Sequence, residues 1–217
     1  GRRGEKKSMQ PFAASSIPLV TLGTFLLWFG WFGFNGFSQL AMGTFDDVNA
    51  ISKIAVNTHL AGAAGTVTGA ALTRLIGGKT DIVMMLNGAL AGLVAITAEP
   101  LTPGPITAMV IGSIGAVIMY YGTKLLENLG LDDVVGAIPV HMFAGIFGTL
   151  VVPFTNSDTS FGTQFVGVIS VCVFSFVLSW ITFSTLKSTV GLRISKAAEK
   201  LGTDKAEVGV IAYSIRD

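Results

Sequence analysis

The residue of this sequence best suited to proton chemistry is His141. It stands in the apolar stretch IPVHMFAG, two residues after Pro139. A histidine side chain can accept or pass on a proton near neutral pH, and placing one in apolar surroundings is costly unless it finds a partner or lines a wet path. A proline inside a helix also removes a backbone hydrogen bond and tends to kink the helix. His141 is therefore either a pore-lining group that accepts or passes on protons or a structural histidine that is hydrogen-bonded to a neighbouring helix.

A second group of candidates combines aromatic rings with small hydrogen-bonding side chains. The segment WFGWFGFNGFS holds six aromatic residues in a short stretch, with Asn35 and Ser38 beside them. Aromatic faces attract cations, and a hydroxyl or an amide replaces part of the hydration that a cation loses. The residues that we expect along a substrate pathway are Trp31, Phe34, Asn35, Ser38 and His141. The alternative for the rings is an aromatic belt at a membrane interface.

Other polar residues in apolar stretches favour structural roles. His59 lies among small residues in VNTHLAGAAG, and Asn57 and Asn87 suit bonds across helices or to exposed carbonyl groups. Asp132 and Asp133 precede an apolar stretch and suit a helix cap. The sequence has no phosphate-binding loop, nucleophile elbow or paired-carboxylate motif, so we expect no enzymatic activity. With two histidines and one cysteine we also expect no metal and no cofactor.

The composition predicts that these residues are carried by membrane-spanning helices. Hydrophobic residues make up 51% of the 217 residues, charged residues only 12%, and the mean hydropathy is +0.67. Soluble domains carry roughly a quarter charged residues. The 27 glycines suit membrane helices, in which small residues allow the backbones to approach closely.

The apolar stretches predict an all-α integral membrane fold with about six transmembrane helices, since a span needs about 20 apolar residues. The predicted spans are 17–36, 51–76, 82–98, 106–126, 134–154 and 161–186. They form a transmembrane domain over 17–192, which lies between a polar loop at 1–16 and a charged tail at 193–217.

The placement of basic residues predicts the orientation of these spans. If the chain has six spans, 13 of its 14 lysines and arginines fall on one side, and only Lys53 falls on the other. Basic residues concentrate in cytoplasmic loops, so we expect both ends of this segment in the cytoplasm. Nothing in the charge pattern suggests a nucleic-acid partner.

Five segments, in order along the chain, resemble motifs of the ammonium transporter family, which includes the Amt, Mep and Rh proteins. They are FGWFGFNGFS, VNTHLAGAAG, LNGALAGLVAIT, DDVVGAIPVHMFAGIFGTL and, in the tail, TVGLR. The resemblance implies about eleven spans, built as two inverted repeats of about five helices plus a final helix, and a homotrimer with a pore in each subunit. This chain is similar to the second repeat with the final helix, so we expect it to be a fragment, from a bacterial inner membrane.

The resemblance also implies roles for individual residues. Phe34 is similar to a phenylalanine that closes the outer pore mouth, Ser38 to the hydroxyl that contacts ammonium, and His141 to the second of two pore histidines. Together they imply that ammonium is captured at an outer aromatic site and deprotonated, and that ammonia crosses an apolar pore past a histidine pair. His59 matches neither family histidine.

The sequence departs from the family pattern in two places. Gly136 stands where the family often has an aspartate. Val208 and Val210 replace family residues in the tail, where a PII-type regulatory protein is a candidate partner. The alternatives to transport are an ammonium sensor with the same fold and an unrelated six-helix channel.

Overall fold

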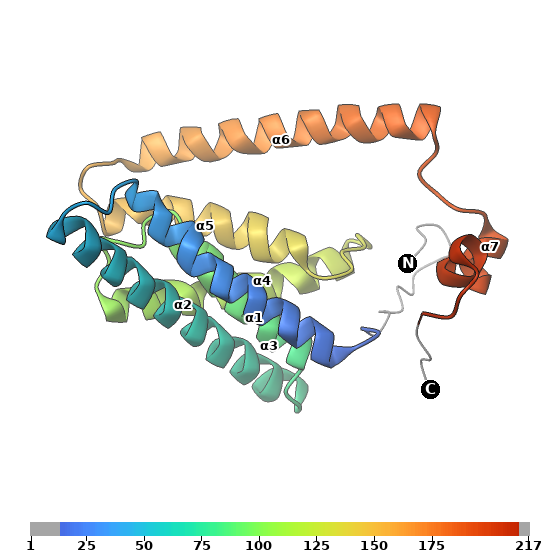
Figure 1. Cartoon of the computed structure of the whole chain (residues 1–217), viewed down its shortest axis with the longest axis horizontal. Helices are drawn as coiled ribbons and strands as arrows, with labels where there is room; N and C mark the ends of the chain where they lie inside the picture. The colour runs from blue at the N-terminus through green and yellow to red at the C-terminus, as the bar shows by residue number, and fades with distance from the viewer. Residues whose placement is uncertain (1–13, 213–217) are drawn as a thin grey trace. The chain divides into compact units, whose positions relative to one another are not determined.

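The computed structural model describes residues 14–212, and every regular element in that range is helical. The helices are α1 Ile17–Gly36, α2 Phe45–Gly77, α3 Ile82–Ile96, α4 Pro105–Asn128, α5 Ala144–Val151, α6 Phe161–Thr189 and α7 Lys196–Leu201 (Figure 1). Short helical turns are η1 Phe37–Gln39, η2 Ile138–Phe143, η3 Val152–Phe154 and η4 Asp204–Val208, of which η2 and η4 are π-helical. The predicted all-α fold is confirmed.

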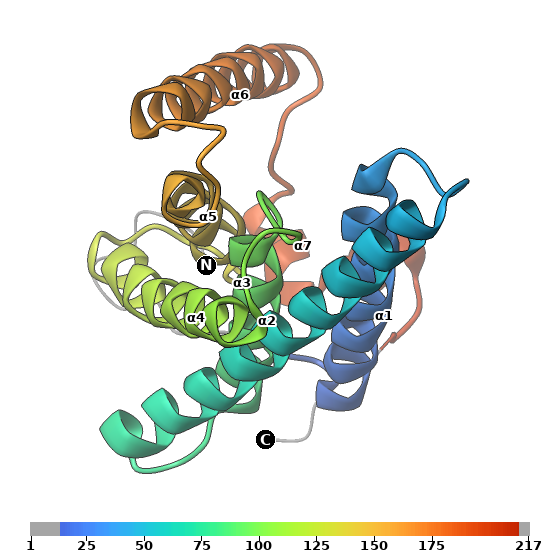
Figure 2. The same cartoon turned by 90° about the vertical axis from the view of Figure 1, so that its left-hand side faces the viewer.

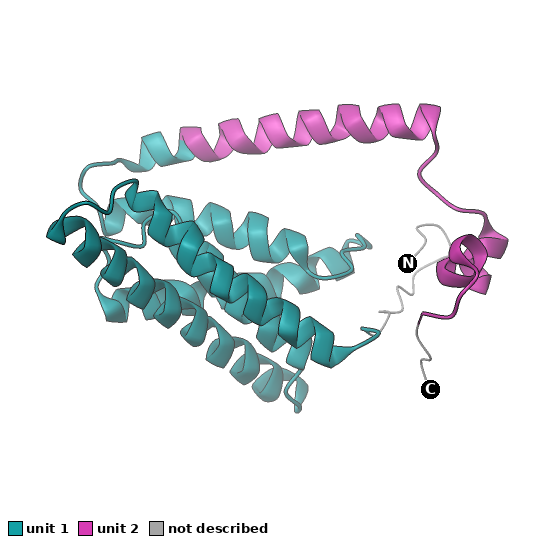
Figure 3. Cartoon of the chain, viewed as in Figure 1, with its two compact units in different colours: residues 1–165 teal, residues 166–217 magenta. Residues whose placement is uncertain are grey.

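The chain divides into two compact units, residues 1–165 and 166–217 (Figure 3). Within the described residues, the first unit contains α1 to α5 and the start of α6, and the second contains the rest of α6, α7 and η4. No residue of the second unit between 166 and 212 is buried. Most of the predicted 1–16 loop and the last five residues of the tail lie outside the described range.

The apolar helices differ in how well they match a membrane span. Among the described residues, three helical segments are long and apolar enough to cross a membrane: Ile17–Gln39, Pro105–Asn128 and Phe161–Thr189. Two further apolar segments, Ile82–Ile96 and Ile138–Phe154, are shorter.

Helix α2 begins earlier than the sequence predicted, at Phe45 instead of residue 51. The reason is a capping box: the Asp47 N–H donates to the Thr44 hydroxyl at 3.2 Å, and the Asp47 carboxylate accepts from the Thr44 N–H at 3.0 Å. The Thr44 hydroxyl and the Gln39 amide also donate to this carboxylate, and these bonds lower the pKa of Asp47 below its ordinary value.

The predicted span 134–154 is not one continuous helix. Residues 134–136 form a turn, and Gly136 has a left-handed backbone with φ +75°. A helix cannot continue through that conformation, so helical structure starts after it and passes through η2, α5 and η3 in turn. The π turn of η2 contains both Pro139 and His141.

Helix α3 is the centre of the first unit. It packs against α1, α2, α4, α5 and η2 (Figure 2). Small residues make the closest of these contacts possible. A Cβ on Gly88 would lie 2.6 Å from the Gly65 carbonyl oxygen, and a Cβ on Gly112 would lie 2.7 Å from the carbonyl carbon and the Cα of Ala61. Helices α2, α3 and α4 therefore meet backbone to backbone, as the glycine content predicted.

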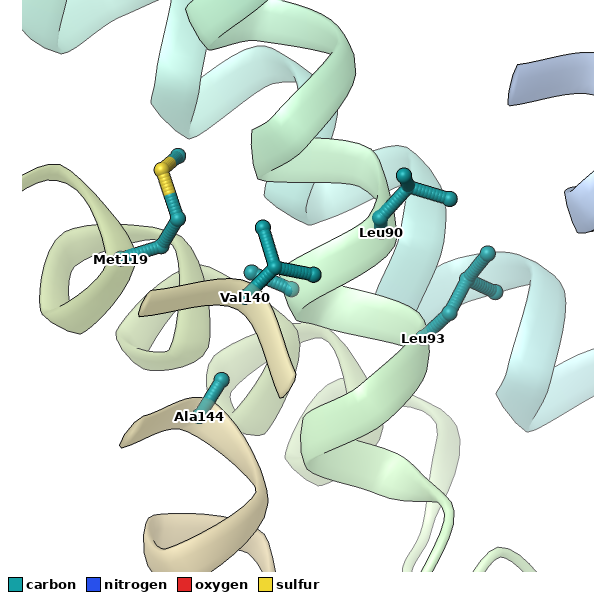
Figure 4. Packing of buried hydrophobic residues seen from close by; sticks show 6 residues of the cluster. Leu90, Leu93, Met119, Val140 and Ala144 are labelled. Carbon is teal, nitrogen blue, oxygen red and sulfur yellow. The ribbon is translucent and has the colours of Figure 1, made fainter. Parts of the chain in front are cut away.

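A buried apolar cluster joins α3, α4 and the segment that carries His141 (Figure 4). Its members are Leu90, Ala91 and Leu93 of α3, Met119 of α4, Val140 of η2 and Ala144 of α5. Val140 is 2% exposed, whereas the next residue, His141, is exposed. The cluster therefore holds one face of this segment and leaves the other face open.

We predict that Gly112→Ala destabilises the bundle. The added Cβ must displace the Ala61 backbone, and overpacking of this kind costs about 1–3 kcal/mol. Equilibrium unfolding in mixed detergent micelles measures the change. Gly77→Ala is the matched control, because no heavy atom lies within 4 Å of a Cβ at that exposed position. Equal stabilities of the two variants would contradict backbone contact between α2 and α4.

Candidate functional site

Three of the predicted pathway residues lie along one face of α1 and its end. Trp31, Phe34 and Ser38 are spaced by three and four residues, which places them on one side of a helix. The Trp31 and Phe34 rings are 5.9 Å apart between centroids and tilted by 53°. The Ser38 hydroxyl lies one turn further on and donates to the Phe34 carbonyl at 3.1 Å. Rings and hydroxyl thus form a continuous strip.

His141 joins this strip from another helix. Its imidazole stacks on the Trp31 indole, with centroids 6.5 Å apart and an interplanar angle of 17°. Ser38, Phe34, Trp31 and His141 thus follow one another from the end of α1 towards its middle; we call these four residues the aromatic strip. Phe34 is 64% exposed and His141 is exposed, so the described chain leaves the strip open on one side.

Trp31 is fixed by a residue that sequence reasoning missed. The indole Nε1–H donates to the Thr97 hydroxyl at 2.7 Å, and that hydroxyl donates in turn to the Leu93 carbonyl at 2.7 Å. Thr97 caps the C-terminal end of α3. A partly buried tryptophan usually needs a partner for its N–H, so a threonine at the end of a neighbouring span was the available signal.

The backbone before His141 is held by side chains at both ends of a turn. The Asp133 carboxylate accepts from the N–H groups of Ala137 at 2.9 Å and Ile138 at 2.8 Å, which confirms Asp133 as a helix cap. Asn87 of α3 donates to the Val135 carbonyl at 2.9 Å, a bond to an exposed carbonyl of the kind expected for this residue. These three bonds fix where the His141 segment starts.

Asn35 does not belong to the aromatic strip. Its side chain is buried, 1% exposed, and its amide donates to the Thr58 hydroxyl at 2.9 Å across the contact between α1 and α2. Successive residues turn by about 100° around a helix, so Asn35 faces a different direction from its neighbour Phe34. Asn35 was expected along the substrate pathway, but its side chain instead joins α1 to α2.

His59 lies in a separate aromatic contact between α2 and α1. Its ring stacks on Phe32 at 6.2 Å and 20°, and lies 5.5 Å from the Trp28 ring at 43°. This arrangement agrees with the structural role expected for His59. It also shows that part of the WFGWFGFNGFS segment packs inside the bundle and does not form a simple interfacial belt, since Trp28 and Trp31 both contact the buried apolar cluster.

The buried Asn57 side chain forms hydrogen bonds to the loop between α3 and α4. Its amide donates to the buried carbonyls of Pro100 at 2.9 Å and Pro103 at 2.8 Å, so Asn57 has the structural role expected for it. Across residues 14–212, no three histidine, cysteine, aspartate or glutamate side chains gather in a way that could hold a metal ion.

The strip itself offers rings, one imidazole and one hydroxyl, and these suit a small cation that can donate hydrogen bonds and lose a proton.

We predict that Thr97→Val frees the Trp31 indole. Valine keeps the shape of threonine but removes the acceptor, and an unpaired, partly buried N–H costs about 1–3 kcal/mol of unfolding free energy. The nitrogen resonance of the Trp31 indole N–H should shift in the same variant. In Thr97→Ser, which keeps the hydroxyl, the unfolding free energy and the indole resonance should both stay close to those of the unmodified protein. Thr185→Val on α6 is the control, because the exposed Thr185 hydroxyl bonds only back to the Ile181 carbonyl. An unshifted indole resonance in Thr97→Val would show that Thr97 does not hold Trp31.

Comparisons with known proteins place the chain in a family. The model of the Ammonium Transporter Family matches residues 1–213. The chain is 41% identical to ammonium transporter Amt2 of Archaeoglobus fulgidus, over 91% of the chain and 46% of that protein. It is 36% identical to a putative ammonium transporter of Synechocystis sp., over 95% of the chain and 48% of that protein.

Solved structures give the same result. A structure of a sensor Amt protein superposes with a TM-score of 0.81 at 35% identity, over 88% of this chain and 49% of that chain. Mep2 of Candida albicans superposes with a TM-score of 0.79 at 26% identity, over 94% of this chain and 48% of that chain. The chain thus spans about half the length of the curated relatives that it matches.

Proposed function

Because the chain belongs to the ammonium transporter family, we propose that it supplies half of a pathway that takes up ammonium and passes it across a membrane as ammonia. The chain is an integral membrane protein, as the apolar helices and the family both indicate. The observation that carries the proposal is the aromatic strip, in which His141 stacks on Trp31 beside Phe34.

Capture of the cation is the first step that the strip supports. Ammonium is a compact cation that only donates hydrogen bonds. The Ser38 hydroxyl already gives its hydrogen to the Phe34 carbonyl, so its oxygen remains free to accept from a cation. The Trp31 and Phe34 rings add cation–π attraction, which strengthens as water is removed. Ser38, Phe34 and Trp31 together replace part of the hydration shell of ammonium.

Proton transfer is the second step. An N–H bond of ammonium breaks, its proton passes to an unprotonated imidazole nitrogen, and ammonia is left. His141 is the group of the strip that can accept this proton. A neutral molecule crosses an apolar passage far more cheaply than a cation does. The proton then leaves through a second histidine, which the family resemblance places in the other half of the pathway.

The exposed side of the strip is the surface against which the other half of the pathway packs in this proposal. Phe34 and His141 are exposed in this chain, whereas Val140 and Ala144, on the opposite face of the same segment, are buried. We propose that a further repeat of similar fold covers Phe34 and His141 and completes the pore. The proposed assembly is a homotrimer with the basic ends of this segment in the cytoplasm, in a bacterial inner membrane, where the tail offers a docking segment for a PII-type protein.

We predict that His141→Ala lowers ammonium-driven current by roughly two orders of magnitude, the scale on which a positioned proton acceptor acts. The current is measured in proteoliposomes containing the whole protein, with its oligomeric state checked in parallel. His59→Ala is the matched control, since it removes the histidine that packs between Trp28 and Phe32. An unchanged current in His141→Ala would refute the proton-transfer role.

A second function, ammonium sensing, is favoured by the similarity to the sensor Amt protein. The two functions differ in flux. A transporter moves methylammonium into vesicles with every turnover, whereas a sensor binds ligand and alters its contacts with a partner without comparable flux. Uptake of labelled methylammonium above that of empty vesicles supports transport, and saturable binding without uptake supports sensing.

A further inference from the structure

We propose that Asn87 and Gly136 act as a pair of positioning residues for His141. This inference rests on the proposed function, because the position of His141 matters for transport only if His141 handles the proton of the substrate. The two residues lie on α3 and on the turn before η2, and neither belongs to the aromatic strip.

The turn before η2 sets the direction from which the His141 segment starts. The Gly136 N–H donates to the Asp133 carbonyl at 3.4 Å, and the Gly136 carbonyl accepts from the Val140 N–H at 3.1 Å. Gly136 is thus the last residue of the turn and the first acceptor of the helix. Its φ of +75° suits glycine, because a side chain rarely adopts that conformation.

Asn87 holds this turn from the neighbouring helix. Its amide nitrogen donates to the Val135 carbonyl at 2.9 Å, immediately before Gly136. The same nitrogen would lie only 2.7 Å from a Cβ at position 136. A side chain at position 136 would therefore displace the Asn87 amide from its place against the turn. Asn87 and Gly136 depend on each other, since one supplies the bond and the other supplies the space.

Helix α3 consequently fixes the His141 segment at two points. Asn87 holds the turn, and one helical turn further along α3 Leu90 belongs to the apolar cluster that contains Val140 (Figure 4). The segment then continues as the π turn η2, whose hydrogen bonds span five residues instead of the four of an α-helix, so the direction in which its side chains point depends on where the turn begins. The rotation of the π turn decides whether His141 faces Trp31. Asn87 and Gly136 fix the rotation of this segment at its start, and the buried Val140 fixes it in the middle of the segment.

The pair requires a residue without a side chain at position 136. A Cβ there would lie too close to the Asn87 amide nitrogen, and the φ of +75° is one that side chains rarely adopt. The start of the segment is capped by Asp133, whose carboxylate accepts from two N–H groups. Gly136 therefore contributes to the position of the turn and, through it, to the position of His141.

The test is a double-mutant cycle in the whole protein with Asn87→Ala, Gly136→Ala and the combined variant. The first readout is the imidazole NMR resonance of His141, in a His59→Gln background that leaves one histidine in this segment to observe. The second readout is methylammonium uptake and its pH profile. A residue that only stabilised the fold would lower the yield of protein without moving the resonance or the profile.

We expect Asn87→Ala and Gly136→Ala each to shift the His141 resonance and to lower uptake about tenfold, because small misplacements of a reacting group cost this much or more. In the combined variant the loss should be smaller than the product of the two single losses, since Asn87→Ala removes the obstacle to the new Cβ. Two controls carry the same chemical changes elsewhere. Gly130→Ala places a side chain at a φ of +67°, so it strains the backbone in the same way, but no heavy atom lies within 4 Å of the added Cβ. Asn128→Ala removes an exposed amide.

Each outcome decides between the alternatives. An unmoved His141 resonance in Asn87→Ala overturns the proposal, and this variant decides the matter even if Gly136→Ala does not fold. Equal effects of Gly130→Ala and Gly136→Ala also overturn it, because backbone strain alone would then explain the loss. If the resonance moves as expected but the unmodified protein takes up no methylammonium, the positioning pair stands and the proposed transport function fails.

Discussion

Close backbone packing around α3 is the constraint on which the rest of the structure depends. Glycines and alanines let α2, α3 and α4 approach until carbonyl groups of one helix lie against Cα atoms of the next. In a membrane this packing replaces the hydrophobic effect as the main attraction between helices. With α3 at the centre, residues of α3 and its C-cap contact several parts of the site. Thr97 bonds to Trp31, Leu90 and Leu93 pack against the His141 segment, and Asn87 bonds to the turn before it.

The chemistry of the site follows from what the bundle leaves open. Val140 and Ala144 anchor the His141 segment in the core, so His141 on the other side of η2 can face the α1 rings. In the function that we propose, the hydroxyl and the two rings stabilise the cation, and His141 accepts its proton. Each group then replaces part of the water that the cation loses.

Much of this arrangement could be predicted from the sequence, and the exceptions have physical causes. The bounds of α1 followed from an apolar stretch that begins after the Ser16 cap, and His141 stood out because a polar group among apolar residues is costly. The start of α2 was predicted late because the capping box at Thr44 and Asp47 is polar and does not look like part of a span. The broken start of the His141 segment depends on the backbone conformation of Gly136, which hydropathy does not reveal. Asn35 was expected beside the rings and Thr97 was not, because only packing decides which polar group bonds to a ring and which bonds to another helix.

The central claim is that the aromatic strip lines the path of ammonium, and a structure of the whole protein with bound methylammonium tests it most directly. The account predicts density for the cation against the Ser38 oxygen and the Trp31 and Phe34 rings, with His141 enclosed by protein on the inner side. Phe34 and His141 facing lipid, with no ligand density beside Trp31, would contradict it.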